Sequence, residues 1–188
     1  MSENPEYLFW YPGFLYFGKE AVMTNQDYMK RALELAKKAM GYTSPNPMVG
    51  CVVVKDGRIV TEGYHERCGE YHAERNALTK CSEDLTGATM YVTLEPCQMC
   101  AGAIVQARIP RVVIGSMNSK AGCAGSIINL LNMPQFNHQA EVVRGVCDEE
   151  CSTMLSTFFR ELRQKKKAEK EAGKEALKET PASQNIRI

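Results

Sequence analysis

The first strong pattern of apolar positions lies between residues 24 and 41 and has the period of a helix. Thr24 offers a hydroxyl to cap its start, and Asp27 completes a variant of the capping box three residues later. Gly41 ends it, because glycine readily adopts the left-handed conformation found at helix ends. Between these signals, apolar side chains recur at steps of three and four residues, at Tyr28, Met29, Ala32, Leu35, Ala36, Ala39 and Met40.

Two apolar runs after this helix predict a β-hairpin. Residues 49–54 and 58–64 are joined at Asp56-Gly57, a dipeptide typical of the tight turn between antiparallel strands. Further strands are predicted at residues 89–94, 111–115 and 141–143, and helices near His72 and at 97–106, 126–131 and 148–163. This order predicts an α/β fold, a three-layer α/β/α sandwich with a central mixed five-stranded sheet.

By composition the chain divides into three parts. Residues 23–164 carry the predicted elements and have the length of one domain. Residues 1–22 form an aromatic extension with three interpretations. It binds a partner or stacks on bases, it packs as an N-terminal arm, or it precedes a natural start at Met23. Met23 directly precedes the helix signal, which favours the last two interpretations. Residues 165–188 form a charged tail, either a solvated extension of the last helix or a disordered segment, and we expect disorder.

The overall composition is that of an ordinary globular protein. Apolar residues make up 44% of the 188-residue chain and the net charge is +1, so composition alone does not indicate nucleic acid as a partner. No run of about 18 apolar residues is present, so no membrane span is expected. Eight cysteines without a secretory signal favour reduced thiols and a metal site in the cytoplasm over a disulfide framework.

Two short motifs carry the residues for metal chemistry, namely His72-Ala73-Glu74 and Pro96-Cys97-Gln98-Met99-Cys100. Two cysteines three apart at a helix start both reach the space in front of that helix, and a histidine starting a neighbouring helix supplies a third ligand. Three protein ligands leave zinc one position for water, which is the arrangement of a catalytic site. We therefore expect one zinc ion per chain, held by His72, Cys97 and Cys100.

Glu74 is predicted as the catalytic acid and base. Two residues from the histidine, its carboxylate reaches the activated water without binding the metal, and it moves protons to the ring nitrogen and the leaving amine. The combination H-x-E with P-C-x-x-C is the signature of zinc deaminases, whereas a structural zinc would need a fourth ligand and no Glu74. Cys147 and Cys151, four apart on a predicted helix, are more typical of one packed and one exposed thiol.

With these motifs the chain resembles the cytidine and deoxycytidylate deaminase superfamily, and two of its families are visible. Residues 96–163 resemble bacterial tRNA-specific adenosine deaminase, in segments 96–104, 119–126, 137–138, 148–151 and 158–160. Residues 28–77 resemble the deaminase half of the riboflavin-pathway enzyme, in segments 43–50, 62–65 and the short run into His72. The tRNA enzymes usually have asparagine at the position of His65, whereas the riboflavin enzymes space their two zinc cysteines further apart than Cys97 and Cys100.

The resemblance to the tRNA enzymes implies hydrolytic deamination of adenosine to inosine at the wobble position of a tRNA, in particular an arginine tRNA. The base must leave its stack to reach the metal, so the partner would be a splayed anticodon loop. One alternative is deamination of the riboflavin-pathway intermediate diaminohydroxyphosphoribosylaminopyrimidine. Another is a non-catalytic zinc module that binds RNA, in which Glu74 would have no role. The resemblance also implies a cytoplasmic homodimer whose second subunit helps to form the RNA groove.

Substrate contacts are expected from both halves of the chain. Asn46 is expected to hydrogen-bond the base, and His65 either bonds the ribose or packs against the hairpin. Asn118 stands where the tRNA family usually has aspartate; without the charge, we expect weaker discrimination between RNA and DNA. Further expected contacts are Ala73, Lys120, Phe159 and Arg160, the last two forming with Phe158 an aromatic and cationic surface for an RNA loop. The basic run 163–167 either contacts phosphates or is a solvated face.

Overall fold

The computed structural model describes residues 23–179, which contain one mixed sheet of five strands in the order β2-β1-β3-β4-β5. β1 pairs antiparallel with both β2 and β3, whereas β3, β4 and β5 run parallel. The strands are β1 (Gly50–Lys55), β2 (Arg58–Tyr64), β3 (Thr89–Leu94), β4 (Arg111–Ser116) and β5 (Glu141–Arg144). The mixed five-stranded sheet expected from the sequence is therefore confirmed.

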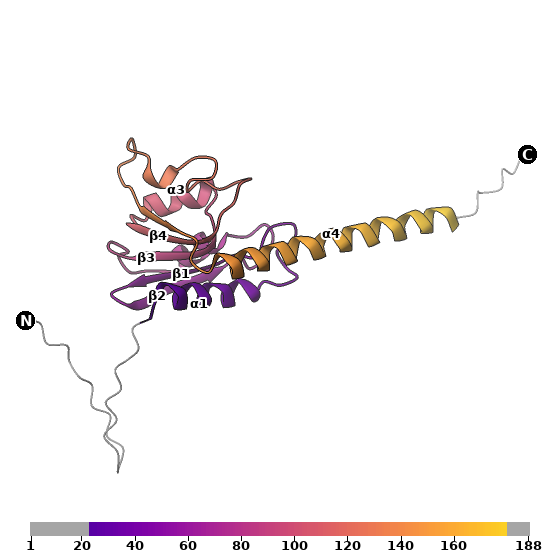
Figure 1. Ribbon diagram of the computed structural model, residues 1–188, viewed down its shortest axis with the longest axis horizontal. Helices are drawn as coiled ribbons and strands as arrows, with labels where there is room; N and C mark the ends of the chain where they lie inside the picture. The colour runs from indigo at the N-terminus through magenta and orange to yellow at the C-terminus, as the bar shows by residue number, and fades with distance from the viewer. Residues whose placement is uncertain (1–22, 180–188) are drawn as a thin grey trace, which may run out of the picture.

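Helices cover both faces of this sheet (Figure 1). They are α1 (Asn25–Lys37), α2 (Ala73–Lys80), α3 (Gln98–Gln106) and α4 (Asp148–Glu179). Alternate strand residues point to opposite faces, so Val52 packs with Met29 of α1 and Cys151 of α4, whereas Val53 packs with Ala77 of α2 and Ile104 of α3. This arrangement confirms the three-layer α/β/α sandwich.

The local signals at the start of the domain are present as predicted. The Thr24 hydroxyl accepts a hydrogen bond from the Asp27 amide, and the Asp27 carboxylate accepts one from the Thr24 amide at 2.8 Å. Asp56 and Gly57 have φ values of 51° and 74°, the left-handed pair that a two-residue hairpin turn of this type requires. No described helix is both long and apolar enough to cross a membrane.

The prediction of a helix at residues 126–131 was wrong. Only a 3₁₀ turn, Leu130–Asn132, forms there, and Ala124 and Asn129 pair in an isolated bridge. The reason is tertiary, because the Ser126 amide donates to the carboxylate of Glu95 and the Ile127 amide to the carbonyl of Gly122. These bonds hold the segment as a loop wrapped around the end of β3.

The expectation of a disordered tail from residue 165 onwards was also wrong for residues 165–179. Helix α4 continues to Glu179, so the extension of the last helix is the correct alternative. Lys, Glu and Ala are strong helix formers, and an ion pair between Lys167 and Glu171 (3.9 Å) links adjacent turns. The expectations for residues 1–22 and 180–188 lie outside the described residues.

Candidate active site

Helix α2 presents His72 and Glu74 because it packs closely on the sheet. His72 is the N-cap residue, and the next two residues, Ala73 and Glu74, are buried. Gly63 of β2 allows the approach, because a Cβ atom at this position would lie 2.5 Å from the backbone nitrogen of Ala77. The start of α2 therefore faces the end of β3.

Helix α3 brings the two cysteines to the same place. Cys97 is its N-cap residue and Cys100 lies in its first turn, so both sulfurs point into the space before the helix. Nδ1 of His72 lies 3.6 Å from Sγ of Cys97 and 3.5 Å from Sγ of Cys100, and the three atoms lie within 4.8 Å of one another. Zinc bonds of about 2.0–2.1 Å to nitrogen and 2.3 Å to sulfur, at tetrahedral angles, would place N and S about 3.6 Å apart. The three side chains thus have the spacing and chemistry of a zinc ligand set.

The electrostatics of the three groups favour the metal-binding form of Cys97. Hydrogen bonds from Cys100, from His72 and from backbone amides at the start of α3 lower the pKa of the Cys97 thiol to about 3, although burial opposes them. The pKa of Cys100 is raised, because its thiol donates to Cys97 and because it is buried beside Glu74. The hydrogen bond with Cys97 raises the pKa of His72. A thiolate beside the imidazole attracts a cation.

Glu74 is a buried carboxyl group, only 3% exposed. Burial raises its pKa above the ordinary value for glutamate, against the opposing effects of hydrogen bonds and of the His72 charge. A raised pKa lets this carboxyl group hold a proton at higher pH than an exposed glutamate does, which suits a group that first takes and then donates a proton.

These groups line a cavity of about 210 Å³. His72, Glu74 and Cys97 line it together with Asn46, His65 and Asn118. Cavities for drug-sized ligands have volumes of about 300–1,000 Å³. This one suits a single ring with its amino group rather than a whole nucleotide.

The role of His65 becomes clear from its hydrogen bonds. The ring is 2% exposed; Nδ1 lies 3.0 Å from the carbonyl oxygen of Tyr71, and Nε2 lies 3.2 Å from the amide nitrogen of Asn46. Since a carbonyl only accepts, Nδ1 carries the proton, and Nε2 accepts from Asn46. Both ring nitrogens are engaged, so packing rather than ribose contact is supported. The Asn46 amide is oriented with its oxygen left to accept from a ligand.

Glu95, which we did not predict as a site residue, lines the cavity and holds the loop after β4. Its carboxylate is 2% exposed and accepts hydrogen bonds from the amides of Asn118 (2.8 Å), Ala124 (2.9 Å) and Ser126 (2.9 Å), and from the Ser126 hydroxyl. Burial tends to raise the Glu95 pKa, but these bonds together lower it below the usual value. The only sequence signal was an acidic residue at the end of a buried strand, directly before Pro96.

The other expected contacts lie at different distances from the cavity. Asn118 lines it, but its side-chain oxygen accepts from the amides of Lys120 and Ala121 at 3.2 Å, so the acceptor expected to face substrate instead stabilises its own loop. Lys120, Phe159 and Arg160 do not line the cavity. Phe159 stacks edge-on against Phe158.

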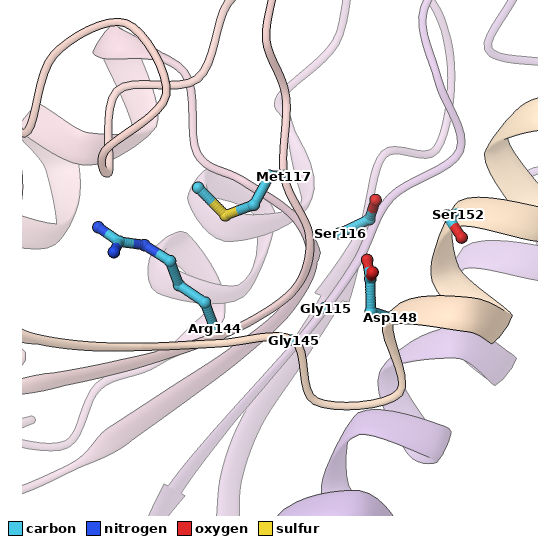
Figure 2. A pocket seen from close by; sticks show the side chains of 7 residues that line it. All are labelled: Gly115, Ser116, Met117, Arg144, Gly145, Asp148 and Ser152. Carbon is cyan, nitrogen blue, oxygen red and sulfur yellow. The ribbon is translucent and has the colours of Figure 1, made fainter.

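A second, more open hollow of about 370 Å³ lies at the carboxyl ends of β4 and β5, beside the start of α4 (Figure 2). Its charged residues are Asp148 and Arg144, and Arg144 donates to the carbonyl of Ala124 at 2.8 Å. None of His72, Cys97, Cys100 and Glu74 lines this hollow. The chemistry therefore belongs to the smaller cavity.

Comparison with known families is consistent with this geometry. Residues 23–116 match the sequence pattern described as the cytidine and deoxycytidylate deaminase zinc-binding region. The chain belongs to this family. Its zinc-binding region contains His72, Cys97 and Cys100, which confirms the expected cofactor.

Two groups of deaminase relatives are equally similar in sequence. A tRNA-specific adenosine deaminase of Bacillus subtilis is 47% identical over 155 residues, covering 77% of this chain and 95% of that protein. A riboflavin biosynthesis protein RibD of Actinobacillus pleuropneumoniae is 47% identical over 150 residues, covering 77% of this chain. The chain spans only 39% of the length of the latter relative.

Solved structures similar to this chain also include both kinds of deaminase, the riboflavin type and the tRNA type. A diaminohydroxyphosphoribosylaminopyrimidine deaminase/reductase from Thermotoga maritima superposes with a TM-score of 0.63 at 42% identity, covering 75% of this chain and 42% of that one. A tRNA:A34 deaminase superposes with a TM-score of 0.58 at 34% identity, covering 68% of this chain and 98% of that one. The family and fold are therefore shown, and the substrate is a separate question.

Proposed function

We propose that the protein deaminates adenosine to inosine at the wobble position of a tRNA. The observation that carries this choice is the spacing of the two cysteines of the ligand set, because Cys97 and Cys100 stand three apart as in the tRNA enzymes that residues 96–163 resemble, whereas the riboflavin enzymes space theirs further apart.

His72, Cys97 and Cys100 would hold the zinc ion. When bound, zinc lowers the pKa of water so that a nucleophile is available at neutral pH. Glu74 takes a proton from the attacking water, passes it to N1 of the adenine ring, and delivers a proton to the leaving amine. A C6–O bond forms, the C6–N bond breaks, and ammonia leaves. The raised pKa of the buried Glu74 carboxyl suits both transfers.

Asn46 and Ala73 would orient the base. Asn46 donates to His65, so its oxygen accepts from the ligand's amino or ring N–H group. Ala73 is fully buried, but it is the first residue of α2, where backbone N–H groups have no partner within the helix. His65 acts through Asn46, as a positioning residue.

A direct comparison of substrates tests the proposal. We expect the purified protein to convert adenosine in a synthetic anticodon stem-loop to inosine, and Glu74→Gln to abolish the conversion while retaining zinc. The diaminopyrimidine ribophosphate serves as the competing substrate. Turnover of that compound alone would overturn the proposal.

Deamination of the riboflavin-pathway intermediate remains the second candidate function because a specific feature favours it. The Asn46–His65 pair lies in the segments that resemble the riboflavin enzyme, and the relatives of that type are as similar in sequence as the tRNA enzymes. A small ribosylated pyrimidine would place its amino group against the same Asn46 oxygen. His65→Asn, which introduces the residue usual in the tRNA family, distinguishes the two: it should retain turnover of the stem-loop but not of the pyrimidine.

The assembly and location are part of the same proposal. We infer a cytoplasmic homodimer acting on an arginine tRNA, with the second subunit completing the RNA groove. Met99, Ile127 and Ile128 are 62%, 60% and 43% exposed, which is unusual for large apolar side chains and favours burial by a second copy. All eight cysteines are free thiols, as a reducing compartment favours. Sedimentation analysis tests the dimer, and monomers at micromolar concentration would contradict it.

A further inference from the structure

Helix α4 has two parts with different surroundings. Its first part packs on the body, where Cys151 and Leu155 are buried and Phe158 packs against the cluster of Ala36, Ala39 and Met48. Residues 163–172 are exposed throughout, and the helix leaves the body there (Figure 1). A helix that buries no face of its own gains little stability from packing. The projecting part therefore offers its whole circumference to a partner.

Five of the seven basic side chains between residues 160 and 174 of α4 lie on one side of the helix. They follow one another at steps of three, four, three and four residues, and this spacing repeats one helix face. We name this set the basic face: Arg160, Arg163, Lys167, Lys170 and Lys174, all exposed. Glu171 borders the basic face and pairs with Lys167 at 3.9 Å.

The charge of this segment stands out from the rest of the chain. Residues 160–174 contain seven basic and three acidic residues, a net charge of +4, whereas the whole chain carries only +1. The positive charge is thus concentrated on the helix that leaves the body. Such a local excess attracts a polyanion.

The basic face begins beside the catalytic cavity. Phe158 packs against the cluster of Ala36, Ala39 and Met48, and the neighbours of Met48 in the chain, Pro47 and Val49, line that cavity. Arg160 follows two residues later. From Arg160 to Lys174 the helix rises about 21 Å at 1.5 Å per residue. A substrate whose reacting ring occupies the cavity would need to be a polymer to reach the far end.

We propose that the basic face of α4 binds the phosphate backbone of the duplex stem next to the loop whose base enters the cavity. This inference rests on the proposed function. About 21 Å corresponds to roughly six phosphates of one strand at 3.4 Å each, so the basic face matches one side of a short stem. Lysines and arginines without base-reading groups recognise an RNA duplex by its backbone rather than its sequence.

The composition of the helix favours RNA over a lipid surface. Helices that lie on membranes carry large apolar side chains opposite the basic ones. Within residues 163–172 the apolar residues are alanines only, Ala168 and Ala172. A lipid surface or an acidic protein would be bound by charge alone, and both are outcomes of the test.

The test compares two charge-matched variants of the full chain. Lys170→Gln with Lys174→Gln removes two charges from the basic face. The control variant, Lys30→Gln with Lys165→Gln, removes two exposed charges outside the basic face. Lys30 lies in α1, and Lys165 faces the opposite side of α4, because it stands two residues from both Arg163 and Lys167. Glutamine keeps a helix propensity close to that of lysine, which circular dichroism verifies. The probes are a synthetic RNA hairpin with a stem of about ten base pairs, chosen to exceed the six phosphates estimated above, and the same loop as an unpaired strand.

At about 0.1 M salt, we expect the basic-face variant to bind the hairpin on the order of tenfold more weakly than wild type. The logarithm of its association constant should fall less steeply with the logarithm of the salt concentration, with a slope smaller by about 1.5–2. Its affinity for the unpaired strand should equal that of wild type, and the control variant should match wild type on both probes. Three outcomes would overturn the inference. The basic-face variant could lose affinity equally for both probes, or the two variants could behave alike. Wild type could also bind phosphatidylglycerol vesicles or polyglutamate more strongly than the hairpin. Stem-dependent binding without deamination would refute the proposed substrate and still support the basic face.

Discussion

Replacing Glu95 by glutamine should destabilise the protein strongly, although the two side chains have the same shape. The carboxylate is 2% exposed and each oxygen accepts two hydrogen bonds: Oε1 from the amides of Ala124 and Ser126, Oε2 from the amide of Asn118 and the hydroxyl of Ser126. An amide keeps one oxygen, and its NH₂ group would face donors instead of accepting from them.

The size of the effect follows from the donors left without a partner. Two donors lose their acceptor, and each unsatisfied buried donor costs about 1–3 kcal/mol. The Ser126 hydroxyl can rotate and recover part of this loss, so we expect a reduction of about 1–5 kcal/mol in the free energy of unfolding. Typical domains have only about 5–15 kcal/mol of total stability.

Urea denaturation of the zinc-loaded protein measures this change, provided that the slope of the transition is unchanged. Glu83→Gln is the matched control, because Glu83 is exposed and pairs only with Arg58 at the surface, so its loss should change stability by less than about 0.5 kcal/mol. If Glu95→Gln is no more destabilising than Glu83→Gln, then the loop after β4 is not held by this carboxylate.

Three further predictions concern the cavity. Cys97→Ala should lower zinc content from one ion per chain to well below half of that, as measured by atomic absorption; unchanged zinc would exclude the proposed ligand set. Glu74→Ala should retain zinc and the far-ultraviolet spectrum but lower kcat by a factor on the order of 10²–10⁴, and a near-normal rate would require another proton carrier. Asn118→Asp should leave stability unchanged, because a carboxylate oxygen accepts from the same two amides, Lys120 and Ala121. It should raise the ratio of RNA to DNA hairpin turnover; an unchanged ratio would show that Asn118 only holds its loop.

Local signals in the sequence determined most of the elements. The capping box at Thr24 and Asp27 and the turn at Asp56-Gly57 act between residues close in the chain, so their geometry follows from the sequence nearby. The zinc ligands were predictable for a related reason. A histidine and two cysteines at helix starts have few other uses in this spacing, and the three atoms meet as expected.

Other features depend on contacts between distant segments and left only weak traces in the sequence. Residues 126–131 have a helical pattern, but the Glu95 carboxylate, some thirty residues earlier, binds the amides of Ala124 and Ser126. The Leu130 amide, which a helix would bond to the carbonyl of Ser126, donates instead to the carbonyl of Cys123. The sequence leaves two roles open for His65, and only the fold shows that its two ring nitrogens lie against Tyr71 and Asn46.

The length of α4 shows the same division. Its helix-forming composition was visible in the sequence, yet a run of Lys and Glu residues is equally compatible with disorder. The buried Cys151 and Leu155, with Phe158 packed against the cluster of Ala36, Ala39 and Met48, anchor the helix to the body, and its projecting part continues from there. Sequence by itself thus determined the elements and the metal chemistry, because both depend on residue type and short spacing. The tertiary structure alone decided which buried polar groups shape the cavity, because their hydrogen bonds join segments that only folding brings together.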